Sequence, residues 1–184
     1  RRRFRYWRKR ASLLVRQAAP GEPAVIVPPA EVLADLNRRL PMEEQGGLYF
    51  TILYGVFDLE SREFRFAMGG HTPLVVVERG GELKCVEADG ISIGGMDDME
   101  FDDEVVSLHP GDRIFLYSDG VPAAMDRGLN EYGDDRMIDE INRARDETLD
   151  EAVGQLLQSV QRWCGRSGPK DDVSILALEV DSTS

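Results

Sequence analysis

The feature of this sequence that most limits its fold is a change in the period of its apolar residues. Between residues 48 and 118, short runs of branched and aromatic residues alternate with polar ones, which predicts strands. Between residues 134 and 164 the apolar residues recur at helical spacing, and between 171 and 180 the strand pattern returns. Strands first, helices late and a last returning strand predict an α+β fold with largely antiparallel sheets.

Turn signals divide the first of these regions into separate strands. The turns are DLES (58–61), RGGE (79–82) and HPGD (109–112). The predicted strands cover residues 48–57, 62–68, 73–78, 83–88, 100–108 and 112–118. Phe64 and Phe66 alternate with charged residues, so we expect that strand to bury one face.

Three helices are predicted from apolar spacing and from capping residues. They cover residues 30–40, 134–145 and 148–164. The first follows a proline-rich surface connection (19–29) and has one apolar face, formed by Val32, Leu33, Leu36 and Leu40. The last begins with Thr148 and Glu151, the spacing of a capping box. Its predicted apolar face consists of Leu149, Val153, Leu156, Leu157, Val160 and Trp163.

The charge of the chain is uneven and limits its partners. The 184 residues are 42% apolar and 30% charged, as is usual for a globular protein of one domain. Residues 1–10 hold seven basic residues and no acid, which leaves 15 basic and 34 acidic residues, a net charge of −19, over residues 11–184. An acidic body argues against a nucleic-acid surface. The basic start is a strand with a solvated face or a surface tail; the alternative is an adaptor that contacts anionic lipid or nucleic acid.

Targeting signals and soft metal ligands are scarce in the sequence. No apolar run approaches the roughly 20 residues of a membrane span, and the basic start is not followed by the apolar stretch of a signal peptide. We therefore expect a cytoplasmic protein in which Cys85 and Cys164 are two buried free thiols. His71 and His109 are too few for a zinc site, so carboxylates would have to hold any metal.

Carboxylates stand where two predicted strands meet turns. Asp119 follows the strand 112–118 directly, and Gly120 behind it would let the backbone come close to whatever Asp119 holds and would give the turn freedom in φ. Asp171 and Asp172 immediately precede the last strand. Mg²⁺ and Mn²⁺ take oxygen ligands and retain several waters, which two such turns could offer. By itself, however, an Asp-Gly pair is most often only a turn.

Several segments, taken in order, resemble the metal-dependent serine/threonine protein phosphatases (the PPM superfamily), specifically their bacterial SpoIIE/RsbU branch. The segments are AMGGHTPLVV (67–76), GISIGG (90–95), GDRIFLYSDGVPAAMD (111–126), NEYGDDRM (130–137) and KDDVSILALEV (170–180). The resemblance covers roughly residues 28–180. It implies two antiparallel β-sheets packed face to face and flanked by helices, with a site for two Mn²⁺ or Mg²⁺ ions at one edge.

The resemblance also implies roles for individual residues. Asp119 matches the metal-binding aspartate of the Ser/Thr-Asp-Gly turn, and Gly120 is the glycine of that turn. Asp171 matches the metal-binding aspartate that opens the last strand, with Asp172 beside it as a ligand or a supporting carboxylate. Asp119 and Asp171 are thus the expected catalytic residues.

Three further residues match positions that shape the site. Gly70 and His71 belong to the Gly-His-Pro turn of the family, here with Thr72 inserted, and His71 is expected to organise the turn rather than bind metal. Gly94 matches a glycine in a loop that crosses near the site. The acids of EYGDDR (131–136) are expected to be solvated or capping.

The resemblance implies metal-assisted hydrolysis of phosphoserine or phosphothreonine, without a phosphoenzyme. The expected substrate is a phosphorylated regulatory protein of the anti-sigma-factor-antagonist type, in bacterial signalling. Family members often carry a sensor or receiver domain before the phosphatase domain, and a homodimer is compatible with the pattern.

One family motif is not found in the chain. The family has an Asp-Val-Ser-Gly-Lys/His-Gly segment whose aspartate bridges both metals, and this chain has Arg8, Lys9 and Arg10 at the corresponding place. The resemblance implies that the strand before this segment is RFRYW (3–7) and that the helix after it is ASLLVRQ (11–17). Either the segment belongs to the protein and is absent from this chain, or the domain is degenerate and acts as a partner-binding regulatory module. Retention of Asp119 and Asp171 favours the first explanation. The expected organisation is one phosphatase domain over residues 1–184 that lacks this N-terminal metal-binding segment.

Overall fold

The structure is a computed structural model that describes residues 13–17, 22–96 and 98–181. These residues form two compact units along the chain. The first contains the described residues up to 57 together with 65–70 and 88–105, and the second contains 58–64, 71–87 and the described residues from 106 on.

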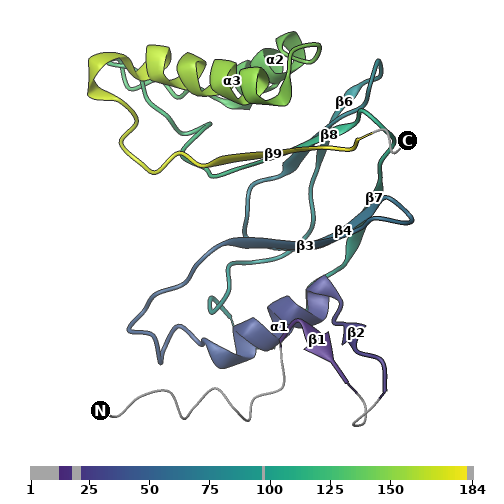
Figure 1. The fold of residues 1–184 in the computed structure, drawn as a ribbon. Coiled ribbons are helices and arrows are strands. Elements are labelled where there is room, and N and C mark those ends of the chain that lie inside the picture. Colours follow the sequence, from purple (N-terminus) through teal and green to yellow (C-terminus); the bar gives the residue numbers. More distant parts are fainter. Residues whose placement is uncertain (1–12, 18–21, 97, 182–184) are drawn as a thin grey trace, which may run out of the picture. The chain divides into compact units, whose positions relative to one another are not determined.

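The order of the elements follows the predicted change from strands to helices (Figure 1). The helices are α1 (Pro29–Arg39), α2 (Asp134–Arg143) and α3 (Leu149–Cys164), and a short 3₁₀ helix, η1 (Gly165–Ser167), follows α3. The strands are β1 (Val15–Arg16), β2 (Val25–Ile26), β3 (Ile52–Asp58), β4 (Glu63–Gly69), β5 (Leu74–Val77), β6 (Leu83–Val86), β7 (Glu104–Ser107), β8 (Arg113–Tyr117) and β9 (Ile175–Glu179). The α+β class is therefore confirmed, and the pairings β1–β2, β5–β6, β5–β8 and β8–β9 are antiparallel. None of the helices in the described residues is long and apolar enough to span a bilayer.

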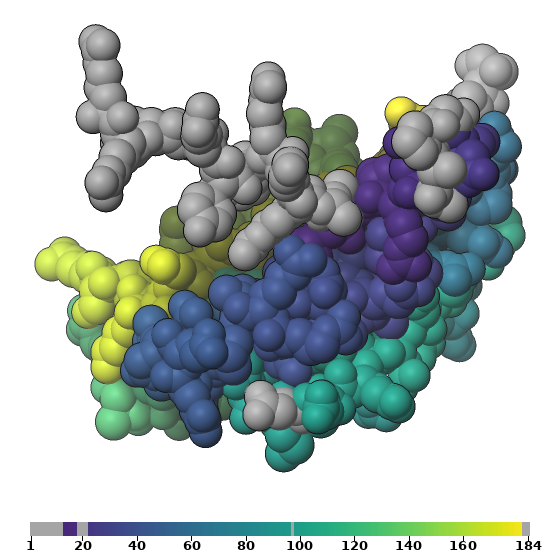
Figure 2. Space-filling model, turned by 90° about the horizontal axis from the view of Figure 1, so that it is seen from below, coloured from purple at the N-terminus to yellow at the C-terminus, as the bar shows by residue number. Residues whose placement is uncertain are grey.

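The first unit is built on α1 and a small apolar core. Pro28 precedes the helix and Pro29 occupies its first turn, as predicted. The core residues Leu33, Ala67, Ile93 and Phe101 have exposed fractions of 7% or less. Figure 2 shows the surface of this unit, with α1 and the segment after it in blue and the β1–β2 hairpin in purple.

A three-stranded sheet has the order β3-β4-β7. The predicted burial of one face of β4 is confirmed, because Phe64 and Phe66 are 5% and 0% exposed. The buried run continues through the last three residues of the strand, where both faces of β4 are covered. A strand buried on both faces has no need of alternating polar residues, and the sequence loses its alternation there.

The second unit pairs a four-stranded sheet with two helices. The sheet has the order β6-β5-β8-β9. Its residues Val75, Val77, Phe115 and Tyr117 pack in one cluster with Met137, Ile141, Leu156 and Val160 of α2 and α3. The two helices thus cover one face of this sheet (Figure 1).

The capping box predicted for the last helix is present. The Thr148 hydroxyl accepts a hydrogen bond from the backbone N–H of Glu151, and the Glu151 carboxylate accepts one from the Thr148 N–H. The predicted apolar face is slightly wrong. Ala152 and Cys164 are also buried and Leu157 is 37% exposed, because the buried face of α3 is shifted to one side of the predicted apolar stripe.

Two other predictions need correction. The helix expected at 11–17 is wrong for its described part, because Val15 and Arg16 form β1 and pair with β2, which lies within the expected proline-rich connection. Cys164 is a buried free thiol, but Cys85 is exposed, since it stands on β6 at the edge of its sheet. The predicted basic strand at the start of the chain lies outside the described residues.

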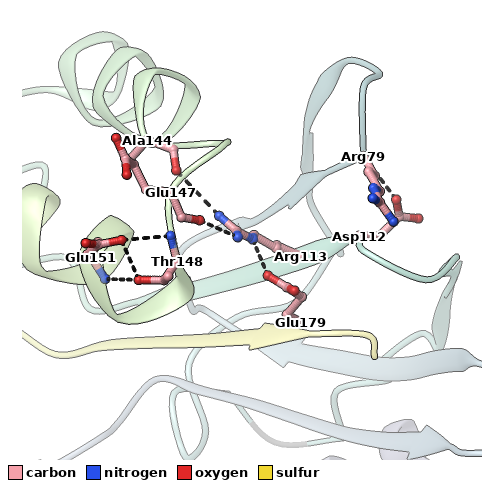
Figure 3. A network of polar contacts seen from close by, with 8 residues as sticks. All are labelled: Arg79, Asp112, Arg113, Ala144, Glu147, Thr148, Glu151 and Glu179. Atoms are coloured by element: carbon pink, nitrogen blue, oxygen red, sulfur yellow. Dashed lines mark hydrogen bonds and ion pairs between the residues drawn. The ribbon is translucent and has the colours of Figure 1, made fainter. Parts of the chain in front are cut away.

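A buried arginine links the start of β8 to the helices (Figure 3). The Arg113 guanidinium donates to Glu179 Oε2 and to the Glu147 carbonyl, both at 2.6 Å, and to the Ala144 carbonyl at 3.4 Å. Ala144 is the C-terminal cap of α2 and Glu147 precedes α3, so Arg113 holds the connection between these helices against the sheet. The neighbouring Asp112 accepts hydrogen bonds from the backbone N–H groups of Arg79 and His109.

Replacing Arg113 by methionine is expected to lower the free energy of unfolding by about 2 kcal/mol, because carbonyl and carboxylate acceptors lose their donor in a largely buried place. Urea unfolding followed by circular dichroism measures this change. The matched control is Arg143→Met, which removes an exposed ion pair with Glu140 and should change stability by less than about 0.5 kcal/mol. Equal effects of the two substitutions would contradict the structural role of Arg113.

Candidate metal-binding site

The Asp119 turn begins where β8 ends. The strand stops at Tyr117, which is 4% exposed, and the chain turns through Ser118, Asp119 and Gly120. The Asp119 carbonyl accepts a hydrogen bond of 3.0 Å from the N–H of Ala123, which closes one turn of helical type. Asp119 itself is exposed. A buried strand therefore ends in a fixed turn that presents a carboxylate to water.

Gly120 lies against the segment that precedes β9. A Cβ atom added to Gly120 would stand 2.4 Å from the carbonyl oxygen of Asp172 and 3.0 Å from its carbonyl carbon. The close approach in the structure is to the backbone of Asp172, whereas the expected approach to a group held by Asp119 stays a prediction. The predicted freedom in φ is wrong, because Gly120 does not have a positive φ. Glycine is needed here because only it leaves room for the Asp172 carbonyl.

The Ser118 hydroxyl joins the two carboxylate-bearing segments, a contact that was not predicted from the sequence. It donates to the Asp172 carbonyl at 2.9 Å and accepts from the Ser174 N–H at 2.9 Å. The Ser118 N–H also donates to the Ser174 carbonyl at 3.0 Å. The only sequence signal for this contact was the serine directly before Asp-Gly.

A second hydroxyl fixes the end of β8 from the β4–β5 connection. Thr72 Oγ1 donates to the Tyr117 carbonyl at 2.5 Å. His71 Nδ1 lies 3.0 Å from the Thr72 carbonyl and 3.2 Å from Thr72 Oγ1. His71 thus stands beside a residue that organises the turn, and Thr72, the insertion in the Gly-His-Pro pattern, makes the contact to β8.

Gly70 and Gly94 lie in the first unit, where they shape one loop. Gly70 has a φ of +65°, and a Cβ there would meet Ser92 Oγ at 2.6 Å. Gly94 has a φ of +84°, and a Cβ there would meet the Leu40 carbonyl at 2.5 Å. The buried Asn37 of α1 holds the same loop, since its Oδ1 accepts from the Gly94 N–H at 2.7 Å. Asn37 gave no signal in the sequence beyond being polar in an amphipathic helix.

The carboxylates of Asp119, Asp171 and Asp172 are exposed, and one of them is oriented by a local contact. Asp171 Oδ1 accepts a hydrogen bond of 2.8 Å from the Asp172 N–H. Exposed oxygen donors on two hydrogen-bonded segments fit Mn²⁺ or Mg²⁺, which proteins often bind through one or two carboxylates while water fills the other positions.

The number of donors is small. Within residues 13–17, 22–96 and 98–181, no group of three or more histidines, cysteines or acidic residues could hold a metal ion. The residues outside these ranges include a single acidic residue, Asp97, and no histidine or cysteine. An ion bound within the described residues would therefore have few protein ligands, and water would have to fill its other positions.

Two other ionisable groups near the end of β8 are unsuited to act as nucleophiles. Burial raises the pKa of the Tyr117 phenol, and the Asp134 carboxylate raises it further. Partial desolvation, followed by the charges of Asp134 and Glu87, also raises the pKa of the Cys85 thiol. Both groups are therefore protonated near neutral pH, and neither supplies a phenolate or a thiolate at this end of the sheet.

Three comparisons with known proteins bear on this site. The family model described as "Stage II sporulation protein E (SpoIIE)" matches residues 11–181. The phosphoserine phosphatase RsbU of Bacillus subtilis is 27% identical over 109 residues, which are 59% of this chain and 32% of RsbU. This chain thus spans about a third of the length of that relative.

Two solved structures have a similar fold. The SiaA-PP2C domain of Pseudomonas aeruginosa matches with a TM-score of 0.72 and 20% identity, over 84% of this chain and 60% of that one. The phosphatase domain of the cell fate determinant SpoIIE from Bacillus subtilis, in a manganese-presoaked form, matches with a TM-score of 0.61 and 19% identity, over 83% and 67% of the two chains. Because the family model covers residues 11–181 and the fold agrees with that of these structures, the chain belongs to the SpoIIE family.

Proposed function

We propose that this domain is a metal-dependent protein serine/threonine phosphatase. The observation that carries the proposal is the direct connection between the Asp119 turn and the Asp171–Asp172 segment, made by the Ser118 hydroxyl and by the close approach of Gly120. Membership of the SpoIIE family supports the reaction class, and the name of RsbU supports phosphoserine as the group that is hydrolysed.

Asp119 and Asp171 would hold the ion, with Asp172 as a further ligand or as support for Asp171. A divalent ion bound there supplies Lewis-acid chemistry, which polarises a phosphoryl oxygen and acidifies a bound water. The presoaked SpoIIE structure favours Mn²⁺, and Mg²⁺ has the same preference for oxygen ligands. The protein would contribute the negatively charged ligands and would hold them in position. Asp119 stands on a turn that is held by the Ser118 and Thr72 hydroxyls, so little reorganisation is needed when a cation arrives.

The proposed substrate is a phosphorylated regulatory protein, of the anti-sigma-factor-antagonist type that the family resemblance implies. We further propose that the domain acts in the cytoplasm, joined in a longer protein to a sensor or receiver domain, and that it can act as a homodimer. The acidic body of the chain supports a protein substrate over a nucleic acid.

A second candidate function is a phosphatase-like module that binds a regulatory partner without catalysis. The observation in its favour is the small donor set, because no group of three metal ligands occurs in the described residues. The two candidates differ in one measurable property, which is hydrolysis that depends on a divalent ion.

Removal of metal is therefore the test of the proposed function. Purified protein should release inorganic phosphate from a phosphoserine peptide when Mn²⁺ is present, and EDTA should reduce release to the uncatalysed rate. Malachite-green detection measures the phosphate, and added Mn²⁺ should restore activity. A chain that binds a phosphoserine partner but gives no Mn²⁺-dependent release would support the binding module instead.

A further inference from the structure

We infer that the Ser118 and Thr72 hydroxyls form a clasp that positions the candidate metal-binding carboxylates. Its members are Ser118, Thr72 and the Asp172 and Tyr117 carbonyl groups that they contact. The inference rests on the proposed function, and it identifies positioning residues that touch neither the ion nor the substrate.

The Ser118 hydroxyl is the central part of the clasp because it uses its donor and an acceptor position on the same neighbouring segment. It donates to the Asp172 carbonyl and accepts from the Ser174 N–H, both at 2.9 Å. These two contacts extend the antiparallel pairing of β8 and β9 beyond its last residue pair, Tyr117 with Ile175. The segment that carries Asp171 and Asp172 is therefore held beside the Asp119 turn after the regular ladder has ended.

The Asp172 carbonyl is constrained from a second direction by Gly120. The distance of 2.4 Å from a hypothetical Gly120 Cβ shows that this carbonyl fits against the bare Cα of the glycine. The Ser118 hydroxyl and Gly120 together determine the position of the Asp172 backbone. The position of this backbone in turn determines where the side chains of Asp171 and Asp172 leave the main chain.

Thr72 holds the end of β8, which leads into the Asp119 turn. Its hydroxyl donates to the carbonyl of Tyr117, two residues before Asp119, at 2.5 Å. Because Tyr117 is 4% exposed, water has little access to replace this donor. The Asp119 turn is therefore held by Thr72 of the β4–β5 connection and by the residues that precede β9.

The consequence concerns metal affinity more than folding. If the carboxylates stood on independent loops, binding of one ion by both loops would cost conformational entropy. Groups that orient metal ligands typically change affinity or activity by about 10- to 100-fold when they are removed. The clasp keeps both segments in register before the ion arrives, so its loss should weaken binding while the sheet remains intact.

The experiment compares Ser118→Ala, Ser118→Thr and the control Ser159→Ala in the full chain. Ser159 also makes hydroxyl contacts, to Tyr132 and Glu140, but it lies on α3. Isothermal titration with Mn²⁺ alone measures affinity, and hydrogen exchange without metal measures protection of the Ser174 amide. We expect Ser118→Ala to weaken Mn²⁺ binding about tenfold and to speed exchange at Ser174. Ser118→Thr should restore both values, and Ser159→Ala should change neither.

Each result separates the clasp from the proposed function. Unchanged exchange at Ser174 in Ser118→Ala would overturn the clasp whether or not the chain binds metal. Faster exchange with unchanged Mn²⁺ affinity would show a structural contact only and would overturn its positioning role. If Asp119→Asn bound Mn²⁺ with the affinity of the unsubstituted chain, this result would contradict the assignment of Asp119 as a metal ligand in the proposed function.

Discussion

Asp119→Asn is expected to reduce Mn²⁺-dependent phosphate release by at least about a hundredfold. Asparagine keeps the size of the side chain and the backbone contact from Ala123 N–H to the carbonyl of residue 119, but it removes the negative charge. A donor set this small cannot replace a lost carboxylate from nearby residues, since the described chain has no larger ligand group. Steady-state hydrolysis of a phosphoserine peptide across a range of Mn²⁺ concentrations measures the effect.

The matched control for this substitution is Asp139→Asn. Asp139 is an exposed aspartate on α2, so its replacement changes the net charge equally and leaves the proposed ligands untouched. Its activity should stay within about twofold of the unsubstituted chain, because a single screened surface charge contributes little. Full activity of Asp119→Asn, or an equal loss in both variants, would rule out Asp119 as a ligand.

Gly120→Ala is expected to lower the free energy of unfolding by about 3 kcal/mol and to abolish measurable Mn²⁺ binding. The added Cβ would lie 2.4 Å from the Asp172 carbonyl oxygen, a distance that no relaxed structure contains, so backbone atoms must move. The movement falls on the segment that carries Asp171 and Asp172. Thermal and urea unfolding give the stability change, and titration with Mn²⁺ gives the affinity.

Gly154→Ala provides the comparison, because it adds the same atom in open space. Gly154 lies in α3 and a Cβ there would meet nothing within 4 Å. Alanine should raise stability by up to about 1 kcal/mol through its better helix propensity. If Gly120→Ala were as well tolerated as Gly154→Ala, the close packing of the two segments would be contradicted.

The sequence allowed the type and the order of most elements to be predicted, because each has a local cause. The capping box at Thr148 and the proline start of α1 both lie within a few residues of the helix that they define. The helix that the family resemblance implied at 11–17 is wrong, because Val15 and Arg16 pair with a strand that begins nine residues after Arg16. A resemblance carried by motifs elsewhere in the chain does not determine this pairing, and a short apolar run suits helix and strand alike.

The site was predictable in part for the same reason. Asp119 and Asp171 could each be placed at a strand end, and the family resemblance suggested that they act together. The contacts that join their segments could not be predicted, because a serine or threonine hydroxyl that bonds to a distant carbonyl leaves no pattern in the sequence. Gly120 was expected to let the backbone approach a group held by Asp119, whereas its contact with the Asp172 carbonyl could be found only from the fold.

By itself, the sequence determined the α+β class, the helix starts and the position of each candidate carboxylate in its own turn. Only the tertiary structure decided that the Asp119 turn and the Asp172 backbone touch, that Ser118 and Thr72 hold them, and that Cys85 is exposed. The physical reason is the range of the interactions. Turn formation, capping and apolar period depend on neighbours within a few residues, whereas the approach of residues 118–120 to 172–174 depends on the register of β8 against β9.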